Sequence, residues 1–382
     1  MSALAPEDEL RLNVMMAGEI QAVRIDEAAL IVYGLSPRGE ASIKLHPTGR
    51  PEQYLRRVRE MLAGKATGSP GGYPVYLHGW TRMGQARDKG LDCLLLLGEV
   101  EAVVSVAYSN GLTDELARRA WWAMPVADNA RRMLERDCVV QGVMGSVLAA
   151  FLIEHLPFEN SPHTIIDTVR LVLQPGLIEA EVRQKLWNRG AIDNAYHVGF
   201  LERMPDDLPV SVPARDDWHA LGDKLTALAE NPFGVQLARV LSTSGQAFLQ
   251  TVEAILRYPA DRDVVYSLLN ALSAYFPFRL SAAADDTVEA VIANAVAFCS
   301  DPSSSAGQFL QDLPEYADEV RAMLVLSCMN STVAAPILSH STASGTLMRQ
   351  KLEPVTTPIL QQIAVLRGQA FNATTQRRRT RT

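Results

Sequence analysis

The residues that could most readily do chemistry in this chain are its cysteines and histidines. No CxxC pair occurs, so neither a disulfide framework nor a zinc ribbon is predicted. The histidines are scattered, and no two lie at the spacing of metal ligands. We expect no metal site and no cofactor, and we assign no catalytic residue. Apolar neighbours favour core packing over reactive thiols for all four cysteines, which are Cys93, Cys138, Cys299 and Cys328.

Sequence motifs for dinucleotide binding, serine hydrolysis, zinc proteolysis and calcium binding do not occur in the chain. Residues 79–86 have the glycine spacing of a phosphate-binding P-loop but lack its Lys and its Ser or Thr. Because those two side chains contact phosphate and magnesium, we interpret the match as chance. The sequence therefore favours a protein that is not an enzyme.

A segment rich in glycine and aromatic residues, residues 68–82, is the most unusual local feature. Exposed backbone amides and rings in such a segment can bind a ligand or a partner. The alternative is a strand connection that its aromatic side chains fix to the rest of the protein. The predicted binding residues are Gly71, Gly72, Tyr73, Tyr76, His78, Trp80 and Arg82.

An internal repeat relates residues 111–130 to residues 176–195. Identical residues recur 65 positions apart at the same offsets, and an internal repeat indicates a repeated structural unit. The shared positions begin with Gly-Leu and end with Asp-Asn-Ala, with one Arg and one Trp between them. Those that define the repeat are Gly111, Arg118, Trp122 and Asp128 in the first copy, and Gly176, Arg183, Trp187 and Asp193 in the second.

Each shared residue of the repeat has a predicted structural role. The glycines are expected to cap helices over 100–108 and 165–173. Each Arg is expected to pair with the acidic residue four positions earlier, Asp114 or Glu179, and to lie over the following Trp. The aspartates are expected to cap the next helices at their N-termini. We therefore interpret the repeat as architecture and not as a functional motif.

The whole chain divides into four predicted parts. Residues 1–86 form a small α+β unit with strands near 20–25, 29–34, 41–45 and 73–77 and a helix over 51–63. Residues 87–205 form the helical repeat region, and the Pro/Asp-rich stretch 204–213 marks its end. Residues 206–370 form a second helical region, with helices expected over 217–229, 233–257, 262–275 and 285–299. Residues 371–382 are predicted to be a disordered basic tail.

The expected fold class is mainly α, with a HEAT-like or irregular helical repeat array after the α+β unit. Successive helices joined by short turns favour this architecture. The period of 65 residues is longer than the usual two-helix repeat. A closed helical bundle is the alternative.

Charge and hydropathy bear on location and partners. The net charge of −7 gives no general attraction to nucleic acid or anionic lipid. The acidic N-terminus lacks the apolar core of a secretory signal, and no apolar run is long enough to span a membrane. We therefore expect a cytoplasmic protein with no membrane span. The basic tail makes RNA a further partner to consider through Arg377, Arg378, Arg379 and Arg381.

Several strings together resemble the DsrS proteins, which are encoded with the dissimilatory sulfite reductase system of sulfur-oxidising bacteria. The strings are residues 10–14 (LRLNV), 68–76 (GSPGGYPVY), 80–85 (WTRMGQ) and 112–122 (LTDELARRAWW). The resemblance is strongest over residues 8–205. It implies a cytoplasmic protein with a role around the oxidation of stored sulfur, and it transfers no catalytic residue.

We expect a non-enzymatic accessory or regulatory protein that binds partners in the sulfur-oxidation machinery. Helical arrays offer extended surfaces for such binding. One alternative is a thiol-dependent enzyme or persulfide handler that uses Cys93 or Cys138. A second alternative is an RNA-binding regulator that uses the arginine tail.

Overall fold

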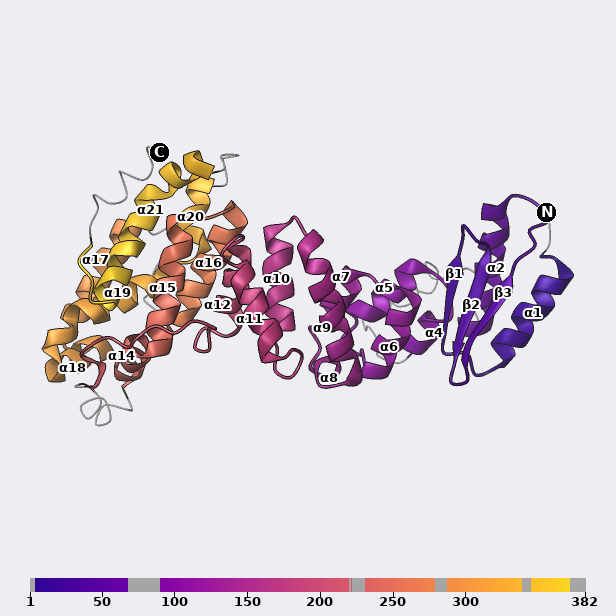
Figure 1. The fold of residues 1–382 in the computed structure, drawn as a ribbon, viewed down its shortest axis with the longest axis horizontal. Helices are drawn as coiled ribbons and strands as arrows, with labels where there is room; N and C mark the ends of the chain where they lie inside the picture. The colour runs from indigo at the N-terminus through magenta and orange to yellow at the C-terminus, as the bar shows by residue number, and fades with distance from the viewer. Residues whose placement is uncertain are drawn as a thin grey trace. The chain divides into compact units, whose positions relative to one another are not determined.

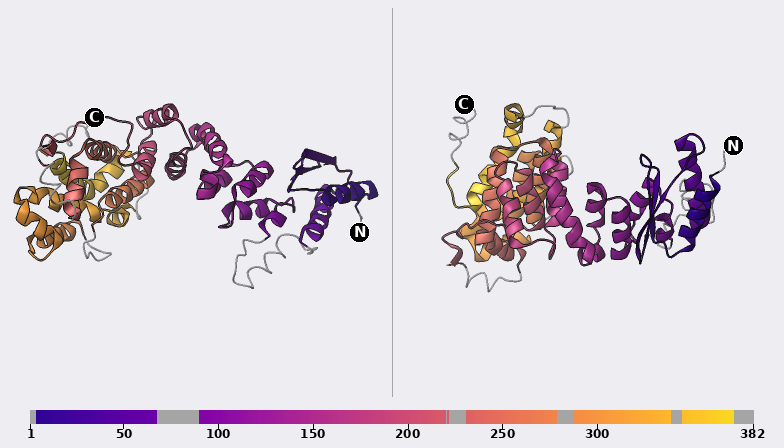
Figure 2. Two further views of the ribbon diagram at one scale, coloured as in Figure 1. Left: turned by 90° about the horizontal axis from the view of Figure 1, so that it is seen from below. Right: turned by 45° about the vertical axis from the view of Figure 1, so that its right-hand side comes forward.

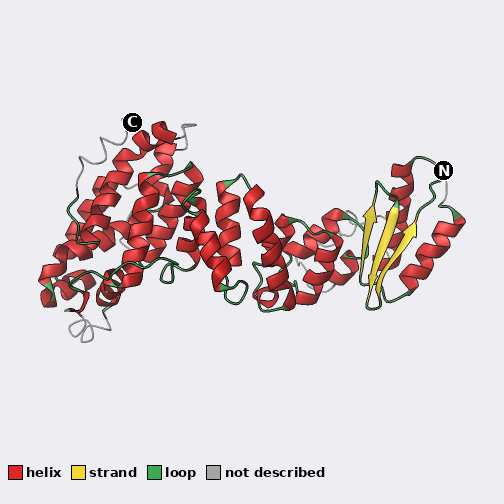
Figure 3. Ribbon diagram, viewed as in Figure 1, coloured by secondary structure: helices red, strands yellow, loops and turns green. Residues whose placement is uncertain are grey.

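The computed structural model describes residues 4–67, 90–219, 221, 231–278, 287–338 and 345–371. The chain groups into two compact units, residues 1–157 with 174–178, and residues 158–173 with 179–382. It is mainly helical, and its described strands form one small antiparallel sheet near the N-terminus (Figures 1 and 3). The predicted mainly-α class with an N-terminal α+β part is confirmed at this level, and the four-part division stays a prediction.

Three of the predicted strands are present, in the order β1–β2–β3. The strands are β1 (Ala22–Asp26), β2 (Ile31–Ser36) and β3 (Gly39–Lys44). Ser36 pairs with Gly39, so Pro37 and Arg38 form a two-residue hairpin turn. Gly39 has φ of +120°, a conformation that residues with a side chain rarely adopt. The predicted strand 73–77 lies outside the described residues.

Helices α1 (Pro6–Ala17) and α2 (Pro51–Thr67) cover one face of the sheet. Leu12 of α1, Val32 of β2 and Val58 of α2 are fully buried in the core between them. Helix α1 was not predicted, although Pro6 and the acidic residues that follow it are typical of a helix start. Only three residues of α1, Asp8, Leu12 and Met15, are buried, and one of them is charged, so the apolar periodicity that predicts a helix is weak here.

The rest of the first unit is built from short helices. Trp122 of α6 reaches the other face of the sheet, where its Nε1 donates to Glu40 at 2.9 Å. The indole ring also lies 4.9 Å from the guanidinium of Arg24. The bounds of the helices are α4 (Leu91–Leu94), α5 (Val100–Tyr108), α6 (Asp114–Ala123), α7 (Ala127–Met133), α8 (Asp137–Val140) and α9 (Val143–His155).

The second unit consists of helices (Figure 2), and its three most closely packed pairs are formed by helices that lie two apart in the chain rather than by consecutive ones. The predicted helix over 233–257 is divided at Ser242, whose side chain accepts from the Gly245 N–H and starts a new helix. The predicted helix over 262–275 is confirmed, whereas most of 217–229 lies outside the described residues. The bounds are α10 (Pro162–Val172), α11 (Ala180–Arg189), α12 (Ala195–Arg203), α14 (Pro232–Leu241), α15 (Thr243–Arg257), α16 (Arg262–Tyr275), α17 (Val288–Ser300), α18 (Ser305–Asp312), α19 (Ala317–Cys328), α20 (Ser331–Leu338) and α21 (Gly345–Leu366).

The glycines and aspartates of the repeat do not all have their predicted roles. Ser109 caps α5, so Gly111 lies beyond the helix end, and Gly176 with φ of +80° lies beyond α10 and its cap Leu173. Asp128 lies inside the first turn of α7, where Val126 is the N-cap. Asp193 accepts from the Ala195 N–H at 3.0 Å beside the start of α12. Loop lengths, which the offsets do not reveal, set these differences.

The arginines of the repeat pair with other acids than those predicted. Arg118 binds Glu115 at 2.7 Å, because Asp114 instead accepts from the Val143 and Met144 N–H groups at the start of α9. Arg183 binds Asp207 at 2.7 Å and not Glu179. The guanidinium of Arg24, and not that of Arg118, lies over the Trp122 ring. The Trp187 ring packs against the rings of His197 and Phe200. The two copies thus use the same residue types in different surroundings.

Among the described helices, none taken singly has both the length and the apolar composition needed to cross a membrane. The bent pair Pro314–Cys328 and Ser331–Leu338, with an angle of 57° between its parts, meets both requirements only when the two are joined.

Candidate functional site

The residues predicted from the sequence to bind a partner lie outside the described residues. This holds for all seven positions between Gly71 and Arg82, and for the four arginines of the tail. The described part of the chain offers a different candidate, a groove in the first unit.

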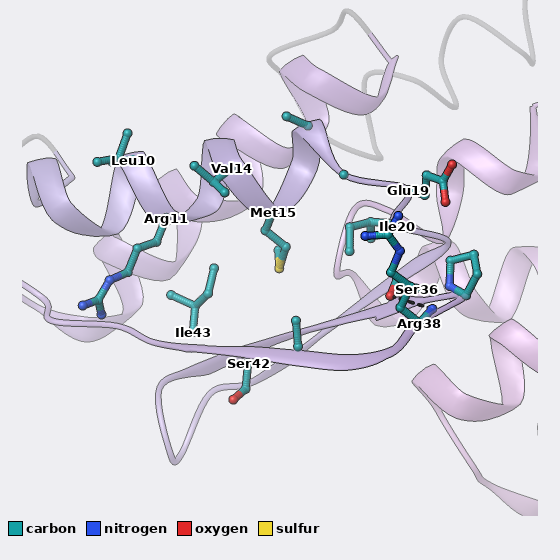
Figure 4. Close-up of a pocket in the computed structure, with 14 residues that line it drawn as sticks. Leu10, Arg11, Val14, Met15, Glu19, Ile20, Ser36, Arg38, Ser42 and Ile43 are labelled. Carbon is teal, nitrogen blue, oxygen red and sulfur yellow. Dashed lines mark hydrogen bonds between the residues drawn. The ribbon is translucent and has the colours of Figure 1, made fainter.

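The groove runs between helix α1 and strand β3 and has a volume of about 730 Å³ (Figure 4). We call it the α1–β3 groove. Leu10 and Val14 of α1 border it, and these residues are 65% and 66% exposed. Ile43 points into it from β3, whereas the Ser42 side chain points to the other face of the sheet (Figure 4). The groove is therefore mainly apolar and lies directly beside a strand.

The two edges of the sheet differ in how they are covered. At the β1 edge, the Val23 N–H donates to the carbonyl of Leu95 at 2.7 Å. The described residues supply no such backbone partner to the β3 edge. A free strand edge next to an apolar groove is the usual receptor for an added strand.

The backbone groups that β3 presents outward follow from its register with β2. The Leu45 N–H donates to the carbonyl of Leu30 at 2.8 Å, directly opposite it. Hydrogen-bonded and non-bonded pairs alternate in an antiparallel ladder. The N–H and C=O groups of Glu40, Ser42 and Lys44 therefore point away from β2, toward solvent.

Charges around the groove are balanced. Arg11 lies at one end and is paired with Glu7 at 2.6 Å, while Arg38 lies at the other end, where Glu19 also borders the groove (Figure 4). Two cations and one anion thus line the groove, and Glu7, just outside it, supplies the second anion. We conclude that apolar contact and backbone pairing, rather than net charge, would hold an occupant.

A buried carboxylate fixes α1 over β3. The side chain of Asp8 is fully buried, accepts from the Tyr54 hydroxyl at 2.6 Å, and accepts from the His46 N–H just after β3 at 2.7 Å. Tyr54 in turn accepts from the Ala5 N–H at 3.0 Å. Burial raises the pKa of Asp8, and these hydrogen bonds outweigh burial and lower it below its usual value. The ionised carboxylate therefore joins α1, α2 and the end of β3.

Gly34 of β2 lets α1 approach the sheet. A Cβ at this position would lie 2.8 Å from Sδ of Met15 and 3.2 Å from Cδ1 of Ile20. Both side chains also line the groove. The depth of the groove thus depends on a glycine whose role the sequence does not reveal.

The second unit has a smaller cavity of about 290 Å³ next to α16. Arg239 lines it but already binds Asp206 at 2.6 Å and lies over the Tyr275 ring at 3.8 Å. Burial raises the pKa of Glu202, another lining residue. These polar groups serve internal contacts, so this cavity is the weaker candidate.

The cysteines differ in exposure. Cys138 is exposed, and its Sγ donates to the carbonyl of Leu112 at 3.1 Å. Cys93 is partly buried, and burial together with Asp92 raises its pKa, which lowers its thiolate fraction at neutral pH. Among the described residues, no three His, Cys, Asp or Glu side chains lie close enough together to hold a metal ion.

No family model matches the chain, and no curated protein or solved structure is significantly similar to it.

The sequence contains one signal for the groove. Leu10 and Val14 are four residues apart, on a different face of α1 from the buried Leu12 and Met15. Two large apolar residues outside the core face of a helix are typical of a contact surface. Their position next to a strand edge could not be read from the sequence, because it depends on how α1 packs on the sheet.

Proposed function

We propose that this chain is a non-enzymatic interaction protein, accessory or regulatory to cytoplasmic sulfur oxidation, and that it docks polypeptide at the α1–β3 groove. The single observation that carries the docking function is a β3 edge to which the described residues supply no backbone partner, beside an apolar groove. A strand added there would gain backbone hydrogen bonds and bury apolar side chains at once. The link to sulfur oxidation comes from the resemblance to the DsrS proteins.

We also infer that the helices after the sheet form a HEAT-like or irregular repeat array. In support, several helices pack against the next helix in the chain, as α5 with α6 and α14 with α15 do, and others pack against the next but one, as α17 with α19 does. Such arrays offer long surfaces for partners. In this proposal the helices supply surface for sulfur-oxidation proteins, and the groove supplies a strand-docking site.

Affinity capture from an extract of sulfur-oxidising bacteria tests the proposal. The intact protein should recover defined proteins of the sulfur-oxidation machinery. Leu10→Glu places a charge at the groove and should reduce that recovery at least about tenfold, because an unpaired charge would be buried by the occupant.

Leu347→Glu is the matched control, since Leu347 of α21 is exposed to 63% against 65% for Leu10. It should recover the same proteins as the intact chain. Circular dichroism should show both variants folded. Undiminished recovery by Leu10→Glu, or recovery of no sulfur-oxidation protein by the intact chain, would contradict the proposal.

A further inference from the structure

We propose that the polypeptide docked at the β3 edge is the β3 strand of a second copy of this chain. This inference rests on the proposed function, because it names the occupant of the same surface. It joins two three-stranded sheets into one antiparallel six-stranded sheet. Three features of β3 support this dimer: its register, the charges along it and the side chains that it would place in the groove.

The outward-facing backbone groups are symmetric about Ser42. Glu40, Ser42 and Lys44 point outward, so an antiparallel copy that places Ser42 opposite Ser42 also places Glu40 opposite Lys44. Every outward group then faces an outward group, which is what a continuous ladder requires. A two-fold axis through Ser42 relates the copies, and it closes the assembly at two.

The charges along β3 are complementary under this two-fold axis. Glu40 and Lys44 would form two identical cross-strand pairs of opposite charge, and such pairs stabilise an antiparallel ladder. Within one chain, Glu40 also accepts from Trp122 and lies 3.3 Å from Arg24, and the Lys44 Nζ donates to the carbonyl of Ala29. These contacts hold both side chains on the face of the sheet opposite α1.

The apolar residues of β3 are also self-complementary. Ala41 and Ile43 alternate with the charged residues, so they lie on the α1 face of the sheet. In the dimer, Ile43 of one copy lies opposite Ala41 of the other, beside the exposed Leu10 and Val14. The strand of the second copy would thus fill part of the groove. The balanced charges in and around the groove let two copies approach without mutual repulsion.

The first test is Ser42→Pro, measured by sedimentation equilibrium over a wide concentration series. Pro at residue 42 removes an N–H that points away from β2, so the β2–β3 ladder keeps its bonds. The unaltered chain should show a monomer–dimer equilibrium, and Ser42→Pro should weaken it at least about tenfold. Near-ultraviolet circular dichroism should confirm that the variant stays folded.

The second test uses charge reversal. Glu40→Lys and Lys44→Glu each place like charges opposite one another in a homodimer, and each should dimerise less than the unaltered chain. Mixed together, the two variants restore both opposite-charge pairs, so a heterodimer should form. Neither folding damage nor a general surface effect predicts that only the mixture associates.

A chain that is monomeric at every concentration, a dimer that Ser42→Pro leaves intact, or a mixture that does not associate would each overturn the proposal. A monomer whose capture of sulfur-oxidation proteins is still lost in Leu10→Glu would retain the proposed function and reject the dimer. A monomer with an intramolecular cross-link between residue 42 and residues 73–77 would identify that predicted strand as the occupant, and would also reject the dimer.

Discussion

The Tyr54 hydroxyl donates a 2.6 Å hydrogen bond to Oδ2 of Asp8, and this bond links two helices 46 residues apart in the sequence. Through Asp8 it also reaches the His46 N–H at the end of β3. The position of α1 over β3, and therefore the α1–β3 groove, depends on this contact.

Tyr54→Phe should destabilise the first unit. The change leaves Asp8 buried with one hydrogen-bond donor fewer and leaves the Ala5 N–H without its acceptor, which costs about 1–3 kcal/mol. Urea unfolding measures the loss. Tyr33→Phe, in β2 of the same sheet, keeps the ring that Arg24 lies over at 4.6 Å and should change the unfolding free energy little. Equal effects of the two changes would contradict this role for Tyr54.

Stability should fall in acid because two carboxyl groups have lowered pKa values. Burial raises the pKa of Asp8, but hydrogen bonds from His46 and Tyr54 outweigh it and lower the pKa. For Glu115, hydrogen bonds from Arg118 outweigh burial and lower the pKa to about 2. Both groups bind protons more weakly in the folded state than in the unfolded state. Their contribution is therefore complete above the unfolded pKa values near 4 and is lost as pH falls through the folded values.

Urea midpoints from pH 6 down to about pH 2 measure this loss. In Asp8→Asn the urea midpoint should be lower at neutral pH. Below about pH 4 it should fall less steeply with pH than in the unaltered chain, because the contribution of Asp8 is absent. An unchanged acid slope in Asp8→Asn would show that Asp8 titrates normally.

Gly199→Ala should destabilise the second unit. The added Cβ would lie 2.7 Å from Cβ of Val169 and 3.0 Å from the carbonyl oxygen of Ile166, where α12 packs on α10. Overpacking of this kind costs about 1–3 kcal/mol. Gly64→Ala is the control, because a Cβ there meets nothing within 4 Å and Ala favours the helix by about 0.5–1 kcal/mol. Thermal unfolding should move in opposite directions for the two variants.

The rates of thiol labelling should differ between the cysteines, and they test the alternative of a persulfide-handling thiol. Cys138 is exposed and should react first at neutral pH, and Cys93, with its raised pKa, should react slowly. The rate at Cys93 should increase steeply above pH 9, as its thiolate forms. Mass spectrometry of labelled peptides measures both rates. Fast labelling of Cys93 at neutral pH would favour a reactive thiol there instead.

The sequence by itself determined the local elements. The hairpin around Pro37 and Arg38, the helix over 262–275 and the mainly helical class all follow from turn residues and periodicity, which act over a few residues. The internal repeat could also be found in the sequence, by comparing segments, and its helices α6 and α11 end near the predicted residues.

Only the tertiary structure decided the partners of those elements. Arg118 pairs with Glu115 because Asp114 accepts a hydrogen bond from the start of α9. Trp122 donates a hydrogen bond to Glu40, which lies 82 residues away in the sequence. The α1–β3 groove arises in the same way, since Asp8 and Gly34 fix how closely α1 approaches the sheet. Burial, hydrogen-bond competition and a strand edge that no described segment covers are properties of chain segments brought together in space, and no local pattern encodes them.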